Sequence, residues 1–459
     1  MEQFKKLFQA TDMTVGTPWK KIVAFTIPML LGNIAQQLYN TVDSIVVGKY
    51  VGDNDLGAGG DEGPIMNVHV ILFIGISMGA SIMVAQYFGA KQREDLSYTI
   101  GNCILLTVIS SIFIMFLALV VVRPLLELLQ TPYTIIDWCT SYLKIMFLGI
   151  AGCAFYNILS GVLRGLGDAF SALVYLLVST VINIILDLLF VAKFGMGVNG
   201  VALATVIAQA VSAILCLIRL SKMKDLFDLN RKYLKWNGKY GKNIIRLGVP
   251  SGLTQAIFSM AMIIVQSLTN SFGEMFIAAN VIVMRVDGFA MLPNFSFGTA
   301  MTTYSGQNIG AAKNDRVTKG AKQGTLIAVL TTTFITSLIL IFGRQLMGIF
   351  TATTELVDLS RRMMGIIAAG YIAMAVTQSL SGVMRGAGDT MTPMWISLFT
   401  TIVVRVPVAY GIAHFTKSAT FPNGRQECVF ISLLCSWLIG AIMTTIFYLR
   451  GKWKNKALR

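Results

Sequence analysis

An asparagine and an aspartate stand four residues apart in the apolar stretch TVINIILDLLF, residues 180–190. In an α-helix this spacing places Asn183 and Asp187 on one face, one turn apart. An ionised carboxylate is costly in such surroundings unless it is paired, protonated or bound to a cation. We therefore expect this pair to bind a cation or to exchange a proton.

Asp43 and Thr205 are the further candidate ligands of this cation site. Asp43 and Asp187 lie at similar depth in their apolar runs, and Thr205 can add a hydroxyl oxygen. Two carboxylates, the Asn183 amide oxygen and a hydroxyl suit a hard cation such as sodium. Burial beside a like charge equally suits a carboxyl group that exchanges protons. The alternative is structural, because an intramembrane aspartate can also hydrogen-bond a neighbouring helix.

Three further polar residues inside apolar runs are candidates for a substrate cavity: Asn33, Gln36 and Asp287. Asn33 and Gln36 can instead hold neighbouring helices together through hydrogen bonds. Asp287 is the one acid well inside a run in the second half of the chain, and Arg285 can be its partner. Arg405 stands in another apolar run of that half.

The elements that position these residues are membrane-spanning helices. The chain has 459 residues, of which 55% are hydrophobic and 13% charged, whereas soluble domains carry about 25% charged residues. Apolar runs of this length cross a bilayer, and in lipid they must be helical. The twelve runs are 22–47, 64–89, 100–122, 137–162, 170–192, 199–219, 243–270, 280–305, 323–343, 361–384, 392–415 and 429–449. We predict an all-α integral membrane protein without a cleavable signal peptide.

The net charge of +15 comes mainly from alternate loops. Lys and Arg gather in residues 91–95, 219–246, 311–322 and 450–459. By the positive-inside rule these loops and both termini are cytoplasmic, and they face anionic lipid rather than nucleic acid. The acidic stretch 53–62 is expected to form a solvated loop on the opposite side, with an attraction for cations as the alternative.

The sequence contains no recognisable set of residues for enzyme catalysis. The six cysteines are scattered without metal-ligand spacing, and there are only two histidines. No nucleophile–base pair, P-loop or dinucleotide fingerprint occurs. We expect no enzyme activity, no cofactor and no metal beyond a sodium ion at the cation site.

The two halves of the chain are copies of one repeated unit. LSGVLRGLGD (159–168) recurs as LSGVMRGAGD (380–389), and the offset of 221 between them also relates AQYFGA (85–90) to GQNIGA (306–311). Six spans per copy make the halves parallel repeats around an axis along the membrane normal, with a substrate path between them. We predict two six-helix bundles, 1–218 and 244–459, joined by a basic linker, 219–243. This organisation favours a transporter over a scaffold.

The repeat also supplies a control for the candidate site. Asn183 and Asp187 correspond to Val404 and Val408, and Asp43 corresponds to an apolar position, 264 or 265. Since the second copy folds without these polar groups, their presence in the first copy indicates function rather than architecture.

The SGVxRGxGD segments are candidates for turns or for a gate. A helix end followed by a tight turn explains their glycines and arginine, and a cytoplasmic hinge needs the same permissive backbone. The residues concerned are Arg164, Gly165, Gly167, Asp168, Arg385, Gly386, Gly388 and Asp389.

These paired segments, together with LYNTVDSIVVGKYVG (38–52) and VAQYFGAKQRED (84–95), resemble the multidrug and toxic-compound extrusion (MATE) family over nearly the whole chain. The resemblance is strongest to the bacterial branch similar to DinF and MepA. It implies a monomeric transporter of the bacterial cytoplasmic membrane that expels bulky cationic organic compounds in exchange for protons or sodium ions. It also implies that a site like Asp43, Asn183, Asp187 and Thr205 carries the coupling ion.

The sequence departs from family members that resemble NorM, whose second-half site uses acids in spans seven, eight and ten. Span seven here, LTQAIFSMAMIIVQSL, contains no acid. The main alternative is a lipid-linked saccharide flippase of the same superfamily. Such a protein needs a basic cavity for pyrophosphate, and only Arg285 and Arg405 lie well inside spans.

Overall fold

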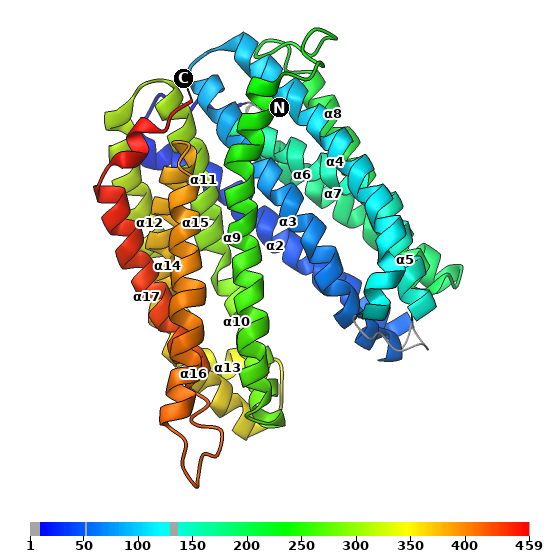
Figure 1. Ribbon diagram of the computed structural model, residues 1–459, viewed down its shortest axis with the longest axis vertical. Coiled ribbons are helices and arrows are strands. Elements are labelled where there is room, and N and C mark those ends of the chain that lie inside the picture. Colours follow the sequence, from blue (N-terminus) through cyan, green and yellow to red (C-terminus); the bar gives the residue numbers. More distant parts are fainter. Residues whose placement is uncertain (1–9, 51–52, 129–135, 459) are drawn as a thin grey trace. The chain divides into compact units, whose positions relative to one another are not determined.

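The structure, a computed structural model, describes residues 10–50, 53–128 and 136–458, without the side chains of residues 39–69. Helices are the only regular secondary structure in that part of the chain (Figure 1). They form two compact units. The first comprises Met1–Asp12 and Pro28–Gly252, and the second comprises Met13–Ile27 and Leu253–Arg459.

The first unit is built from the helices of the first repeat. Its elements are most of α2 (Pro18–Tyr50), α3 (Asp53–Gly89), α4 (Arg93–Leu128), α5 (Ile136–Leu148), α6 (Ile150–Gly165), α7 (Ala169–Asp187), the π-helix η1 (Leu188–Lys193), α8 (Gly197–Ser221) and the start of α9 (Gly238–Asn270). Helix α3 includes the acidic stretch 53–62, so the expectation of a loop there is wrong. A 37-residue helix exceeds what a bilayer core requires, and its polar end can extend beyond the hydrocarbon.

The second unit contains the rest of α9 and the helices of the second repeat. These are α10 (Glu274–Ala290), α11 (Leu292–Gly310), α12 (Asn314–Ile341), α13 (Gly343–Gly348), α14 (Thr354–Gly386), α15 (Met391–Leu398), the π-helix η2 (Phe399–Arg405), α16 (Val406–Phe415), α17 (Cys428–Leu449) and the short η3 (Lys452–Asn455).

Both units contain helices that are long and apolar enough to span a membrane. Ten segments in the described part are long and apolar enough to cross a bilayer, and the bent pair α5–α6, with an angle of 48°, makes an eleventh. Helix α2 contains the first predicted run, 22–47. The prediction of an all-α membrane protein is therefore confirmed.

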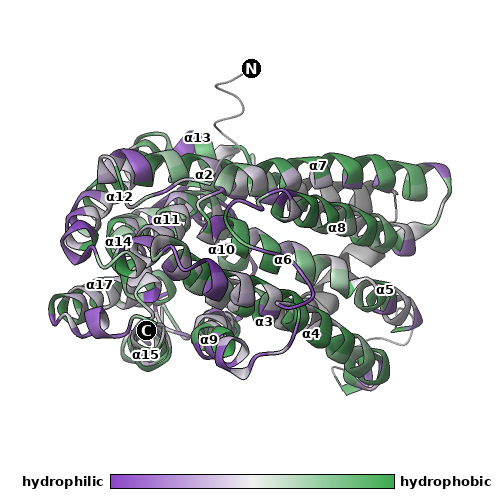
Figure 2. Ribbon diagram, turned by 90° about the horizontal axis from the view of Figure 1, so that it is seen from above, coloured by the Kyte–Doolittle hydropathy of each residue, from purple (hydrophilic) through white to green (hydrophobic). Residues whose placement is uncertain are grey.

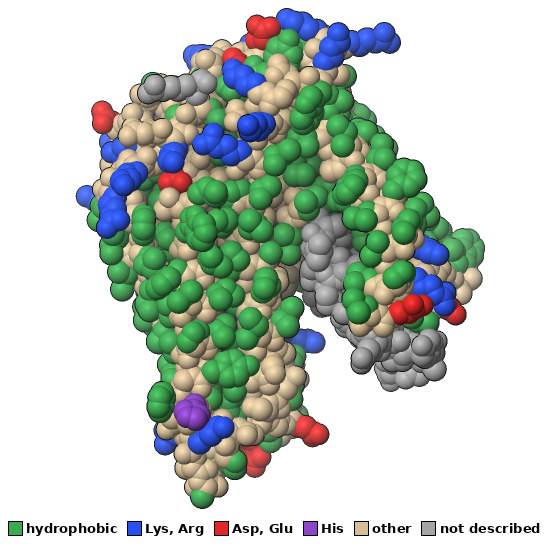
Figure 3. Space-filling model, in the orientation of Figure 1, with side chains coloured by type: hydrophobic (Ala, Val, Ile, Leu, Met, Phe, Trp, Pro, Cys, Tyr) green, Lys and Arg blue, Asp and Glu red, His purple; other side chains and the backbone are tan. Residues whose placement is uncertain are grey.

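Hydrophobic residues make up much of the helices in each unit (Figure 2), and their side chains cover much of the face that Figure 3 shows. On α4, Phe113, Phe116 and Val120 are 65%, 62% and 74% exposed. Charged side chains are found mostly near helix ends (Figure 3). This distribution matches helices whose outer faces contact lipid and whose ends reach water.

The internal repeat is visible in the packing of each unit. Helices α3 and α6 approach so closely that a Cβ atom added at Gly165 would lie 2.7 Å from the Ser81 carbonyl oxygen. Their counterparts α11 and α14 make the same contact, where a Cβ at Gly386 would collide with the carbonyl of Thr302. Both pairs of positions are related by the offset of 221. Small residues at such crossings let membrane helices approach closely.

The basic linker between α8 and α9 folds onto the start of α4. Arg93 forms an ion pair with Asp228 at 2.8 Å and donates hydrogen bonds to the carbonyl oxygens of Asp225 and Lys224. The Tyr98 ring stacks on that of Tyr240, with 5.3 Å between ring centroids. The linker is thus a structured part of the first unit.

Candidate functional site

The polar residues of α7 lie on the inner face of that helix. Asn183 and Asp187 are 1% and 0% exposed, whereas the neighbouring apolar residues Val181 and Ile185 are 57% and 59% exposed. A helix in lipid turns apolar side chains outward, and its few polar ones face protein or a water-filled cavity. The predicted pair is therefore held inside the first unit.

Polar contacts at every fourth residue of α7 join it to the antiparallel α8. Ser212 donates to the Tyr175 carbonyl oxygen at 2.9 Å, and Ser179 donates to the Ala208 carbonyl oxygen at 2.9 Å. One turn further, the Asn183 Nδ2 atom donates to the Thr205 Oγ1 atom at 3.4 Å. Asp187 occupies the next position on the same face. The register of the two helices thus brings Asn183 and Thr205 together.

An unused acceptor lies beside this contact. The Asn183 Oδ1 atom is buried and accepts no hydrogen bond from the residues that the structure describes. An amide oxygen left in this state costs free energy, and it is a suitable ligand for a hard cation. Asp187 also ends α7 and directly precedes the π-helix η1. Such π-helical turns occur frequently at functional sites.

Asp43 lies in α2, and its side chain is outside the described residues. The backbone nonetheless constrains its level in the unit. A Cβ atom added at Gly32 of α2 would lie 3.7 Å from Leu173 and 4.0 Å from Leu176 of α7. Asp43 lies eleven residues after Gly32, and Asp187 lies eleven residues after Leu176 and fourteen after Leu173. Since spans one and five run in the same direction, the two aspartates lie within about one helical turn of the same level.

Asn33 and Gln36 are half-buried in the same stretch of α2. They belong to the first unit, together with Asn183 and Asp187. Asp287 belongs to the second unit. The structure therefore does not bring the three predicted cavity residues together within one unit.

The second unit has a cavity of about 290 Å³ between α9, α10, α14, η2 and α17. Asp287 and Arg405 both line it, and the Tyr371 hydroxyl lies within hydrogen-bonding range of the Asp287 carboxylate. Arg285, the partner suggested by sequence, is exposed and lies over the Phe350 ring at 6.0 Å from its centroid. Sequence reasoning missed the closeness of Asp287 to Arg405. The available signal was that Asp287 is the one acid of its span and Arg405 the one Lys or Arg of its span.

The two SGVxRGxGD segments form the same turn. The amides of Asp168 and Asp389 donate to the carbonyl oxygens of Leu163 and Met384, each at 2.9 Å. Gly167 and Gly388 have φ angles of +83° and +95°, a conformation that favours glycine. Asp168 then caps α7 by accepting from the Ser171 amide at 3.0 Å and pairs with Arg219 at 2.9 Å. Each of these contacts serves the turn and the helix that follows.

The arginines of these segments differ in their partners. Arg164 donates to the hydroxyls of Ser77 and Ser160 at 3.2 and 3.3 Å. The Nε atom of its counterpart, Arg385, is buried without a hydrogen-bond partner among the described residues. The position equivalent to Ser77 is Gly298, so the second repeat lacks one of the two hydroxyls.

Comparison with known proteins gives consistent matches to one family. A sequence model of the MatE family matches residues 28–189 and 250–411, once in each half. The chain is 29% identical to the probable multidrug resistance protein YoeA of Bacillus subtilis, over 87% of this chain and 88% of that protein. It is 28% identical to the probable multidrug resistance protein YpnP of the same organism, over 98% and 99%.

Solved structures show the same fold. The chain matches a crystal structure of MATE in the straight conformation with a TM-score of 0.89 and 24% identity, over 98% of this chain and 99% of that one. An outward-facing multidrug resistance MATE family transporter matches with a TM-score of 0.90 and the same identity and coverage.

Proposed function

Since the chain belongs to the MatE family of multidrug efflux transporters, we propose that it exports bulky cationic organic compounds in exchange for protons or sodium ions. It would act as a monomer in the bacterial cytoplasmic membrane, with both termini in the cytoplasm and the two halves opening alternately to either side. The coupling ion would bind at Asp43, Asn183, Asp187 and Thr205.

The buried polar face of α7 is the observation that carries this proposal. Asp187 is fully buried, Asn183 presents an unused amide oxygen, and Thr205 lies at hydrogen-bonding distance from Asn183. A cation supplies the partner that the Asn183 amide oxygen lacks. Its arrival or loss changes the charge of the first unit, so ion and drug can favour different conformations. Antiport requires this difference.

Ethidium efflux from cells that produce Asp187→Asn tests the site. The amide is nearly isosteric with the carboxylate but cannot exchange a proton or neutralise a cation. Gradient-dependent efflux should fall about tenfold or more, in line with typical coupling free energies. Asp358→Asn is the matched control, because Asp358 is exposed and contacts Arg344 only at 3.9 Å. Undiminished efflux by Asp187→Asn at equal protein level would refute the assignment.

Collapsing the sodium and proton gradients separately in the same cells identifies the coupling ion. Loss of efflux with only one gradient assigns that ion. Efflux that persists when both gradients are absent would exclude secondary active transport altogether.

The flippase alternative is favoured by one observation, the presence of both Arg385 and Arg405 in the interior of the second unit. A pyrophosphate carrier would move a lipid-linked saccharide analogue across the membrane of a proteoliposome and would leave ethidium behind. The buried carboxylate of Asp187 in the first unit favours a cationic cargo instead. Export of cations is therefore our conclusion.

A further inference from the structure

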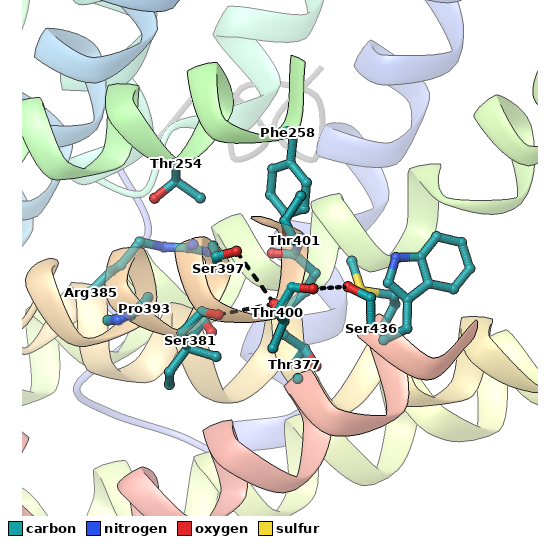
Figure 4. Close-up of a pocket in the computed structure, with 15 residues that line it drawn as sticks. Thr254, Phe258, Thr377, Ser381, Arg385, Pro393, Ser397, Thr400, Thr401 and Ser436 are labelled. Carbon is teal, nitrogen blue, oxygen red and sulfur yellow. Dashed lines mark hydrogen bonds between the residues drawn. The ribbon is translucent and has the colours of Figure 1, made fainter. Parts of the chain in front are cut away.

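The cavity of the second unit has a mostly apolar wall with charged groups set into it. Phe258, Met262, Met284 and Trp437 supply aromatic and thioether surface. A smaller pocket of about 40 Å³ shares Phe258 and Trp437 with this cavity and extends to Arg385 (Figure 4). Together they present two guanidinium groups, Arg385 and Arg405, and the carboxylate of Asp287.

Both guanidinium groups lack partners at their Nε atoms. Arg405 is only 8% exposed, and the Nε atoms of Arg385 and Arg405 are buried without hydrogen bonds to the described residues. Among those residues no ion pair within 4.0 Å involves either arginine. A buried donor left in this state carries a desolvation cost that a bound acceptor removes.

Comparison with the first repeat shows that the fold does not require an arginine at the position of Arg385 to be without hydrogen bonds. Arg164, at the equivalent position of Arg385, donates to two serine hydroxyls. In the second unit one of these serines is replaced by Gly298, and the equivalent of the other, Ser381, lines the pocket beside Arg385 (Figure 4). Arg405 corresponds to Ile184. In the second repeat, therefore, Arg385 lacks the hydrogen bonds that Arg164 makes. Arg405 adds a guanidinium group at a position where the first repeat has an isoleucine.

The charges of the cavity select the ligand class. In the cavity and the pocket that adjoins it, Arg405 and Arg385 against Asp287 leave an excess of one positive charge, which a monoanion neutralises. A carboxylate can accept two parallel hydrogen bonds from a guanidinium group, and aromatic and methionine side chains accommodate an apolar body of varied shape. A small inorganic anion would leave most of the 290 Å³ unfilled.

We propose that this cavity is a second binding site, one for organic monoanions: free organic acids with an apolar or aromatic body and a single carboxylate. The carboxylate binds at Arg405 and Arg385, the body lies against Phe258 and Trp437, and Asp287 limits the net charge that the site attracts. This site does not depend on the coupling ion proposed for the first unit.

Fluorescence titration of the purified full-length protein in neutral detergent tests the proposal. The probe is dansylglycine, whose emission rises in an apolar site, and its neutral match is dansylglycinamide. The native protein should bind dansylglycine more tightly than the amide. Arg405→Gln should weaken dansylglycine binding about tenfold or more, the effect expected for one charge-assisted contact. Arg285→Gln is the control, since Arg285 lies on the same helix as Asp287 but is exposed.

Asp287→Asn distinguishes a lost ligand contact from misfolding, because it should strengthen dansylglycine binding severalfold by removing the repelling charge. Octanoate should displace the probe. Equal binding of dansylglycine and dansylglycinamide, or native affinity in both Arg405→Gln and Asp287→Asn, would overturn the proposal. Displacement by phosphatidylglycerol but not by octanoate would also overturn it, in favour of a lipid headgroup. No gradient is involved, so the result is independent of ethidium efflux.

Discussion

The two units carry different polar and charged groups in their interiors on one repeated architecture. In the first unit the polar groups that α7 and α8 bury include the amide of Asn183, the carboxylate of Asp187 and the hydroxyl of Thr205. In the second unit the positions equivalent to Asn183 and Asp187 are valines, and the cavity with its adjoining pocket presents the guanidinium groups of Arg405 and Arg385 and the carboxylate of Asp287. The helix crossings that hold each unit together are nevertheless the same. The repeat has kept its packing residues and changed its interior polar ones, which separates architecture from function within one chain.

Replacing Asp187 in the first unit by the valine of the equivalent position in the second unit should have the largest effect on transport. Asp187→Val places the valine of position 408 in α7, so the fold should be retained while ion coupling is lost. We expect gradient-dependent ethidium efflux to fall about tenfold or more, with a thermal unfolding midpoint close to that of the native protein. A fold that fails in Asp187→Val would show that the aspartate is structural after all.

Substituting the glycines at the repeated crossings should cost stability in both units. Gly165→Ala and Gly386→Ala each force a methyl group into a neighbouring carbonyl, and overpacking of this kind costs about 1–3 kcal/mol. Chemical unfolding in detergent measures the two losses separately. Gly411→Ala is the control, because a Cβ there meets open space. A large loss in only one unit would contradict the equivalence of the crossings.

Removing a partner of Arg164 should have a smaller effect, confined to the first unit. Ser77→Ala deletes the hydrogen bond of 3.2 Å from the guanidinium and the one of 2.7 Å that the Ser77 hydroxyl donates to the Asn157 carbonyl oxygen, at a cost of about 1–2 kcal/mol. Ser381→Ala in the second unit should cost less, since Arg385 makes no hydrogen bond to Ser381 among the described contacts. Equal losses in the two variants would show that Arg385 is held as firmly as Arg164.

The smallest effect is expected when the pH is lowered, and it concerns the order of the linker between α8 and α9. The hydrogen bond from Arg93 holds the pKa of Asp228 below its usual value. The contribution of this contact is therefore complete above the usual carboxylate range and is lost only as the pH falls through the lowered pKa. The protection of residues 222–237 against hydrogen exchange, relative to the intrinsic rate at each pH, should be high at neutral pH and fall under acidic conditions. Asp228→Asn should show low protection at every pH, and an unchanged pH profile in this variant would disprove the assignment.

Much of this architecture could be predicted from the sequence because the membrane restricts the options. Apolar runs must be helices, and a constant offset identifies the repeat, so α7 and its position within the fold followed from composition and spacing. The pairing of Asn183 with Thr205 depends on the register of α7 and α8. Periodicity places each polar face but does not fix how two helices slide against each other.

The interior of the second unit was harder to predict. Asp287 had a nearer basic residue in the sequence, Arg285, but two residues along a helix turn a side chain to another face. Its neighbour in space, Arg405, comes from a different helix. Likewise, the offset of 221 makes Gly298 the equivalent of Ser77, but only the structure shows that Ser77 accepts a hydrogen bond from Arg164. Tertiary contacts of this kind leave no signal in the spacing of one chain.

The central claim is that the coupling ion binds in the first unit, and ion release upon drug binding tests it most directly. Purified protein in weakly buffered detergent is mixed with ethidium while proton release and bound radioactive sodium are measured. The native protein should release a proton or a sodium ion as ethidium binds, and Asp187→Asn should release neither. Release of the same amount by Asp187→Asn would place the coupling ion elsewhere.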